Sequence, residues 1–330
     1  MYLFFDDPND PAIEALQGNA QVTCIPCTPD HWAQLTPSLD GSIGQRQLLN
    51  SKLALKLAEA AGYTWLSHID SDELLYSTRP LKTFLRQIPA AVDVVHMPPL
   101  EAVPEALDYD CVFQEMTLFK QRGGMKVVAY TSVAKELKRL RSAFLRQKVS
   151  NSDPEAQPVR RYEVGWGDVL RLTLEEYLFQ AKQAIACRLG AARAFRKEYF
   201  NGHLIGKSIL RVGINVKEVE RHRPIPHEGD ILRAMVARDV RVLHFDACGF
   251  EGWKLKWLRR HQGLIIAANM RPVRRLQLQE FSAAYEQGDM EKLIELYKQQ
   301  YFLTEQEKAI LVRLGLATRL HLNANLFQAS

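Results

Sequence analysis

Short apolar segments alternate with helical patterns along the first 130 residues, and this alternation constrains the fold more than any other feature. Strand-like runs occupy residues 2–5, 21–25, 64–69 and 92–97, and helical patterns cover residues 12–16, 45–61 and 80–87. Apolar residues recur at every fourth position from Leu49 to Ala61, and residues 28–44 before them are expected to form a loop. Strands joined through helices generally pair in parallel. The pattern therefore predicts an α/β fold with a mostly parallel sheet flanked by helices.

The rest of the chain is richer in helical patterns. Helices are expected at 168–200, 252–262 and 272–314, with a strand–turn–strand segment at 201–216 around three glycines. We therefore divide the chain into four predicted units, which are residues 1–130, 131–200, 201–262 and 263–330. The last of them is a helical C-terminal extension.

Composition excludes several classes of protein. A chain of 330 residues with 47% hydrophobic content can bury a core without disulfides or a structural metal. Five scattered cysteines favour a reducing cytoplasm, and the C-x-x-C of Cys24 and Cys27 has no second pair at metal-ligand spacing. No apolar run approaches the roughly 18 residues of a membrane span, and no signal-peptide pattern opens the chain. A net charge of +5 is too small to indicate a nucleic-acid partner.

That charge is concentrated in one segment. Residues 132–161 contain eight Lys and Arg residues against three acidic ones, which accounts for the whole net charge. Within them, Val133, Leu137, Leu140 and Phe144 lie on one face of a predicted basic amphipathic helix. Two interpretations stay open, a peripheral contact with an anionic membrane through residues 133–148 and an ordinary surface helix packed by its apolar face.

An acidic turn follows the apolar strand at 64–69. Asp70 and Asp72 are two residues apart, so in an extended backbone both carboxylates project to the same side. Carboxylate oxygens suit Mg²⁺ or Mn²⁺, and α/β sheets bind ligands at the carboxyl ends of their strands. The alternative is an acidic turn that caps a following helix.

The segment W-L-S-H-I-D-S-D-E-L-L at 65–75, with Gln45-Arg46-Gln47 on the preceding helix, resembles family-2 and family-92-like glycosyltransferases of the GT-A fold. Further motifs occur in the family's order, namely Asp6-Asp7 after the first strand, G-K-S-I-L-R at 206–211, L-H-F at 243–245 and F-E-x-W-x-x-K at 250–256. The resemblance covers roughly residues 1–130 and 200–260. It implies a GT-A-like, Rossmann-like domain.

The resemblance also implies transfer of a sugar from a nucleoside diphosphate donor to a glycan, lipid-linked or other acceptor. Residues 1–130 would be the nucleotide-sugar- and metal-binding half, 131–200 a basic helical insertion, and 201–262 the acceptor-side half. Asp70, Asp72 and His244 would hold Mn²⁺ or Mg²⁺. The residues implied to contact the donor are Asp7, Gln45, Arg46, Asp70, Lys207 and Arg211. Candidate catalytic carboxylates are Glu251, Glu115, Glu101 and Glu73, of which Glu73 is expected to orient the metal site rather than act as the base.

Rival interpretations accompany several of these residues. Gly202 and Gly206 before Lys207 are one residue too close for a phosphate-binding P-loop, so Lys207 is either a diphosphate contact or a solvated strand lysine. Trp253 and Trp257 share a helix face and favour core packing over sugar stacking. His222 and His227 are expected to be exposed on a basic loop. All of these residues lie in the 201–262 unit.

Two other functions compete with sugar transfer. One is a catalytically silent carbohydrate- or membrane-surface-binding protein of the same fold, and the other is a metal-dependent phosphodiesterase, which usually needs more His and Asp clusters than the chain shows. The resemblance further implies that a strand–helix unit precedes residues 2–5 in family members. Without it we expect an uncovered apolar edge at 2–5, weak donor binding and self-association.

Overall fold

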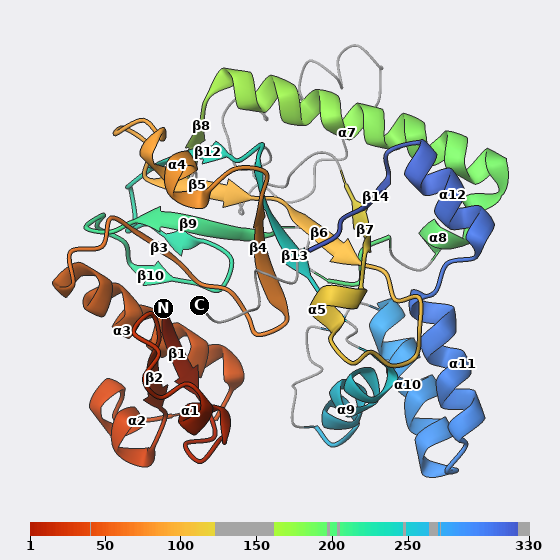
Figure 1. Ribbon diagram of the computed structural model, residues 1–330, viewed down its shortest axis with the longest axis horizontal. Helices are drawn as coiled ribbons and strands as arrows, with labels where there is room; N and C mark the ends of the chain where they lie inside the picture. The colour runs from red at the N-terminus through yellow and green to blue at the C-terminus, as the bar shows by residue number, and fades with distance from the viewer. Residues whose placement is uncertain are drawn as a thin grey trace.

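Two five-stranded sheets form the centre of the computed structural model, which describes residues 1–39, 41–122, 162–196, 199–202, 205–246, 249–263, 270 and 272–322 (Figure 1). The first sheet contains, in spatial order, β3 (Trp65–Ser67), β9 (Lys207–Arg211), β5 (Val94–Met97), β12 (Leu232–Val236) and β8 (Tyr162–Val164). The second contains β14 (Ala317–Arg319), β7 (Leu118–Gln121), β6 (Pro99–Ala102), β13 (Val240–His244) and β4 (Glu73–Ser77). The α/β class is confirmed.

Both sheets are mixed rather than mostly parallel. β12 is parallel to β5 and β8, and β13 is parallel to β6. β9 runs antiparallel between β3 and β5, and β4 is antiparallel to β13. A parallel partner requires a crossover of a dozen or more residues. β4 follows β3 after a short turn and then pairs with β13, which is distant in sequence, so the order of elements alone did not predict the strand directions.

The N-terminal elements lie at one end of the molecule, coloured red to orange in Figure 1. β1 (Tyr2–Phe5) and β2 (Thr23–Pro26) form a parallel pair, accompanied by α1 (Ala12–Ala15), α2 (Pro29–Leu35) and α3 (Ile43–Ala60). α2 lies within the segment expected to be a loop. Thr28 caps it by accepting a hydrogen bond from the His31 backbone, and Pro29 occupies its first position, a start signal that the polar composition concealed.

Helices of the second half of the chain cover the other side of the molecule (Figure 1). α7 (Trp166–Ala186) runs through a π-helical turn at Cys187–Ala191 toward α8 (Arg193–Arg196). α9 (Gly249–His261), α10 (Pro272–Glu286), α11 (Met290–Tyr301) and α12 (Glu305–Arg313) confirm a helical C-terminal region. Trp253 and Trp257 are 2% and 1% exposed in the core among α9, α10 and α11, as the core-packing interpretation predicted. The remaining elements are α4 (Leu81–Arg86), α5 (Val112–Glu115), β10 (Glu218–Val219) and β11 (Pro224–Ile225).

The sheets interleave the four predicted units. The first sheet takes β3 and β5 from residues 1–130, β8 from 131–200, and β9 and β12 from 201–262. The second sheet includes β14 from the C-terminal extension. The basic segment at 133–148 lies outside the described residues. Cys24, Cys27, Cys111 and Cys187 are free thiols, and no described helix combines the length and apolar character of a membrane span.

Candidate functional site

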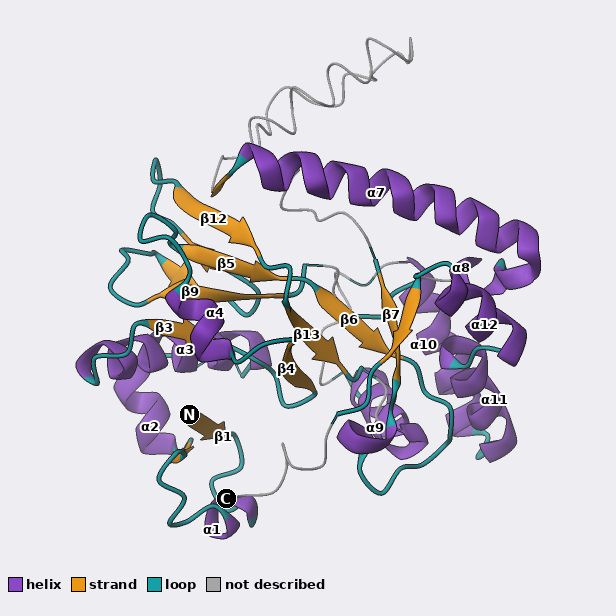
Figure 2. Cartoon of the chain, turned by 45° about the horizontal axis from the view of Figure 1, so that its top comes forward, coloured by secondary structure: helices purple, strands orange, loops and turns teal. Residues whose placement is uncertain are grey.

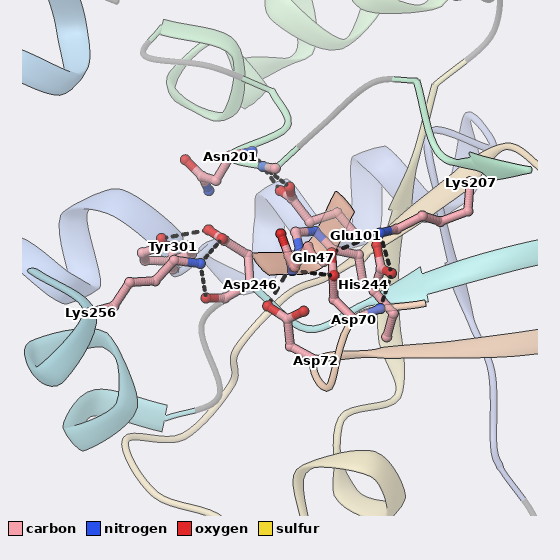
Figure 3. Close-up of polar contacts among 12 residues, drawn as sticks. Gln47, Asp70, Asp72, Glu101, Asn201, Lys207, His244, Asp246, Lys256 and Tyr301 are labelled. Atoms are coloured by element: carbon pink, nitrogen blue, oxygen red, sulfur yellow. Dashed lines mark hydrogen bonds and ion pairs between the residues drawn. The ribbon is translucent and has the colours of Figure 1, made fainter. Parts of the chain in front are cut away.

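A polar cavity of about 350 Å³ lies where β3 and β13 end and β9 begins. It is lined by carboxylates, histidines and cations that come from both halves of the chain (Figure 3). The lining residues are Asp70, Asp72, Asn201, Gly202, Arg221, His222, His244, Asp246, Lys256, Arg260, Met270 and Arg274. The cavity therefore brings together the predicted metal ligands Asp70, Asp72 and His244.

Asp70 is fixed by three donors. Its Oδ1 accepts from Gln47 Nε2 at 3.1 Å and lies 3.2 Å from His68 Nε2, and its Oδ2 lies 2.7 Å from Lys207 Nζ. Ser51, one turn after Gln47 on α3, holds the other nitrogen of His68 at 2.7 Å. Burial alone would raise the pKa of Asp70, but the His68 hydrogen bond and the Lys207 ammonium outweigh it and hold this pKa well below its usual value. Asp70 is therefore a preoriented, ionised carboxylate.

Lys207 is completely buried, so the interpretation of a solvated strand lysine is wrong. Its ammonium also lies 3.1 Å from Glu73, which accepts the Asp70 backbone N–H at 2.8 Å. Burial raises the pKa of Glu73 more than the Lys207 charge lowers it. Gly206 has a φ of 71°, and a Cβ there would lie 2.0 Å from the Met97 carbonyl oxygen, so the close approach that buries Lys207 requires glycine. Lys207 and Glu73 thus support Asp70 from behind and do not line the cavity.

Asp72 and His244 form the middle of the cavity. Asp72 Oδ2 lies 3.6 Å from His244 Nε2. Burial would lower the pKa of His244, but the hydrogen bond to Asp72 and the nearby Asp246 carboxylate raise it to about 9. Gly202 packs against this ring, because a Cβ there would lie 2.3 Å from His244 Cε1. Close packing on one side and Asp72 on the other fix the imidazole.

The turn that carries Gly202 is anchored by Glu101. Glu101 is buried, pairs with Lys120 at 2.8 Å and accepts the backbone N–H groups of Asn201 and Gly202. Its carboxylate is thus engaged by Lys120 and by the backbone of two residues that line the cavity. This contact shapes the site, although Glu101 was considered as a base.

The C-terminal helices supply the opposite end of the cavity. Lys256 on α9 lies 2.5 Å from Asp246, whose second oxygen accepts the Tyr301 hydroxyl at 2.9 Å (Figure 3). Arg260 on α9 and Arg274 on α10 lie beside this pair. Burial would raise the pKa of Asp246, but Lys256 and His244 hold it far below its usual value. Asp246, Arg260 and Arg274 were not predicted from the sequence. Of the residues at this end, Lys256 was marked in the sequence, as the last residue of the F-E-x-W-x-x-K motif.

The predicted three-ligand metal set of Asp70, Asp72 and His244 is not assembled in this structure. Among the described residues, no group of three His, Cys, Asp and Glu side chains is placed to hold a metal. Mg²⁺, however, is commonly bound through one or two carboxylates together with substrate phosphates. Asp72 and His244 can provide two ligands once the imidazole proton is displaced, whereas Asp70 is already occupied by Lys207.

Other predicted contacts lie away from the cavity lining. Arg46 pairs with Asp6 at 2.9 Å, and Gln45 donates to the Ser38 carbonyl. Asp7 accepts from the Asn9 backbone within the turn after β1. The Arg211 guanidinium stacks 4.2 Å from the centre of the Trp65 ring, at the edge of the first sheet. The residue of the 45–47 motif that reaches the site is Gln47.

Two candidate bases are also placed elsewhere. Glu251 is exposed on α9 and pairs with Lys254, and Glu115 accepts from the Cys111 backbone at the end of α5. Neither is among the residues that line the cavity. His222 differs from its expected exposure, because it is half-buried and lines the cavity, whereas His227 is exposed as predicted.

Two curated proteins of Arabidopsis thaliana, both named glycosyltransferase-like, are similar to part of this chain. One is 36% identical over 80 residues, which is 23% of this chain and 16% of the relative. The other is 38% identical over 80 residues, 23% of this chain and 18% of the relative. The match thus spans less than a fifth of each relative's length. No family model and no solved structure matches the chain. The two relatives support a glycosyltransferase-type function and hence a transferase.

Proposed function

We propose that this protein is a metal-dependent glycosyltransferase that moves a sugar from a nucleoside diphosphate donor to a hydroxyl of a glycan, lipid-linked or other acceptor. The observation that carries the proposal is the division of the cavity, in which Asp70, Asp72 and His244 lie at the strand ends and Lys256, Arg260 and Arg274 come from the helices. Asp72 and His244 offer ligands for the cation that a diphosphate needs, and Asp70 offers an oriented carboxylate for the nucleoside, so the helical end remains for a further substrate group. The partial relatives point to the same class of reaction.

In this proposal each residue has a defined task. Asp72 and His244 would hold Mn²⁺ or Mg²⁺, which when bound would supply Lewis-acid stabilisation for a departing diphosphate. Asp70 accepts a hydrogen bond from the donor ribose and is kept ionised and oriented by Lys207, Gln47 and His68. The close packing of Gly202 on His244 leaves the imidazole little freedom to turn away. Preorganised groups of this kind are worth most where water is excluded.

Replacement of Asp72 by Asn tests the proposal, because it removes the ligand's charge and keeps its shape. We expect donor hydrolysis and sugar transfer with Mn²⁺ to fall by about a hundredfold or more, as loss of a preorganised electrostatic contact commonly costs about 3 kcal/mol. The unfolding temperature is expected to change little, because the Asp72 side chain is 34% exposed. Asp230→Asn, which changes an exposed carboxylate outside the cavity lining, is the matched control.

The competing functions give different results in the same assay. A catalytically silent protein binds a nucleoside diphosphate sugar without releasing nucleotide, with or without added Mn²⁺. A phosphodiesterase releases nucleoside monophosphate rather than diphosphate. Transfer at the wild-type rate by the Asp72→Asn variant would contradict the assignment of the metal site.

We also propose that the protein works in the cytoplasm at the inner face of an anionic membrane. The supporting observation is a row of exposed apolar side chains on α7, which runs along the outside of the molecule (Figure 2). The side chains of this row, which are between 45% and 64% exposed, are Trp166, Leu170, Leu174, Leu178 and Ile185. They follow one another at helical spacing, as in helices that lie in a membrane interface. The basic segment at 132–161 directly precedes this helix and is complementary to anionic lipid.

A further inference from the structure

Three cationic side chains and one carboxylate line the helical end of the cavity. Lys256, Arg260 and Arg274 all line this end, together with Asp246. The carboxylate is already used on both oxygens, by Lys256 at 2.5 Å and by Tyr301 at 2.9 Å. Among the described residues Arg260 forms no ion pair, and its guanidinium lies 4.7 Å from the centre of the Trp257 ring. Lys256 is thus paired with Asp246, and Arg260 remains at this end as a cation without an ion pair among the described residues.

Excess buried positive charge is costly unless an anion compensates it. Arg260 and Arg274 are both half-buried, and Arg221 adds a further cation from the loop before β11. A hydrogen-bond donor lies in the same place. Asn201 is 7% exposed, and its Nδ2 is buried with no partner among the described residues. Guanidinium groups beside an unused amide N–H match the oxygen atoms of a phosphate or a carboxylate.

The cations of the helical end lie apart from the place proposed for the donor's diphosphate. Figure 3 shows Asp246, Lys256 and Tyr301 on one side of Asp72 and His244, and Lys207 with Asp70 on the other. The Asp70 side is the one connected to α3 through Gln47. If the diphosphate lies at Asp72 and His244 with its nucleoside toward α3, the helical end is left for the other substrate.

We propose that the end of the cavity formed by Lys256, Arg260, Arg274 and Asn201 binds an anionic group of the acceptor, a phosphate or a carboxylate. The inference rests on the proposed function and adds the substrate class to it. The enzyme accordingly glycosylates a hydroxyl of an acceptor that carries negative charge. Asp246 is the positioning residue that holds Lys256 toward this group.

Isothermal titration with inorganic phosphate, in buffer containing a chelator, tests the anion site without activity. We expect Arg260→Gln to weaken phosphate binding about tenfold or more, since charge-assisted hydrogen bonds commonly contribute at least this much. Arg259→Gln and Arg275→Gln are matched controls, because these neighbours are exposed and do not line the cavity. Arg260→Lys keeps the charge but loses the paired N–H donors of the guanidinium, so it should bind phosphate with intermediate affinity. It replaces Arg260→Gln as the test variant if the latter does not fold.

A second titration, with uridine, guanosine and thymidine diphosphates and Mn²⁺, separates the two substrates. We expect at least one nucleotide to bind wild type and Arg260→Gln equally well, and phosphate to bind the nucleotide-saturated protein. The inference is overturned if the nucleotide displaces phosphate from the wild-type protein. It is also overturned if Arg260→Gln weakens nucleotide binding as much as it weakens phosphate binding, because the cationic end of the cavity would then belong to the donor site. Absence of phosphate binding with nucleotide binding intact also overturns it and leaves the proposed function standing. Absence of binding by every nucleotide contradicts the proposed function itself.

Transfer assays then identify the source of the anion. With the donor found above, sugar phosphates and uronic acids should be better acceptors than the corresponding neutral sugars for the wild type and for Arg259→Gln. Arg260→Gln should lose this preference through a higher KM for the charged acceptor. A preference for a donor whose own sugar is a uronic acid, with neutral acceptors used equally well, would place the anion on the donor and overturn the inference.

Discussion

Replacement of Lys207 by Met removes the cation that supports the acidic turn and keeps the length of its aliphatic stem. In the native protein the Lys207 ammonium is completely buried, 2.7 Å from Asp70 and 3.1 Å from Glu73. The variant leaves both carboxylates without this partner. Removal of one member of a buried ion pair commonly costs about 3–5 kcal/mol, because the remaining charge stays desolvated.

The surroundings limit this cost. Asp70 keeps the hydrogen bonds from Gln47 and His68, and Glu73, whose pKa is already raised by burial, keeps the backbone N–H of Asp70. We therefore expect a loss near the lower bound, about 3 kcal/mol of unfolding free energy. The double variant with Glu73→Gln should recover about half of it, because one of the two uncompensated charges is then removed.

Urea denaturation followed by tryptophan fluorescence and circular dichroism measures the loss, provided that the slope with denaturant is unchanged. Lys52→Met on α3 is the control, since Lys52 is exposed and its replacement should change stability by no more than about 0.5 kcal/mol. A loss below about 1 kcal/mol for Lys207→Met, or no recovery in the double variant, would refute the view that this lysine neutralises the turn.

Two further predictions concern acid stability and the membrane. Burial, together with the Arg223 charge, lowers the pKa of His96 from 6.5 to about 3. The neutral imidazole therefore contributes fully to the free energy of unfolding above pH 6.5. This contribution is lost by about 1.4 kcal/mol per pH unit as the pH falls from 6.5 toward 3. Urea titrations at pH 7 and 5.5 should show a smaller loss of stability on acidification for His96→Gln than for wild type or the exposed control His227→Gln, and equal losses would contradict the assignment. The protein should sediment with anionic vesicles at low salt and not with neutral ones, and Leu170→Glu with Leu174→Glu should abolish this binding, whereas Leu255→Glu on α9 should not. A wild-type protein that ignores anionic vesicles at low salt would exclude the membrane proposal.

The local part of the site could be predicted because it depends on spacing within short segments. Asp70 and Asp72 lie in one turn after β3, and His244 ends a strand that the order of motifs already placed beside them. The spacing of apolar residues from Leu49 to Ala61 predicted the helix but not its buried face, which consists of Ser51, Ala54 and Ala58. A stripe of small residues lets α3 approach closely, and this brings Gln47, on the same face, to Asp70.

The other end of the cavity could not be predicted from spacing. Asp246 follows β13, Lys256 lies on α9 and Tyr301 ends α11, and these residues meet only through the packing of the C-terminal helices around Trp253 and Trp257. No local pattern distinguishes Arg260, which lines the cavity, from Arg259, which is exposed beside it. Tertiary packing decides which of two neighbouring arginines faces a ligand.

The same packing also decides how charge is distributed in the cavity. The motif that drew attention to the site is acidic, which suggested a place for cations. In the folded protein Lys207 compensates Asp70 and Lys256 compensates Asp246, so Asp72 is the lining carboxylate without a lysine partner among the described residues. Arg221, Arg260 and Arg274 line the same cavity, and Arg260 forms no ion pair among the described residues. The cavity that the acidic motif indicated therefore presents positive charge as well. In the proposed function, an anionic acceptor would bind to this charge, and the nucleoside diphosphate would bind at the end formed by Asp72 and His244.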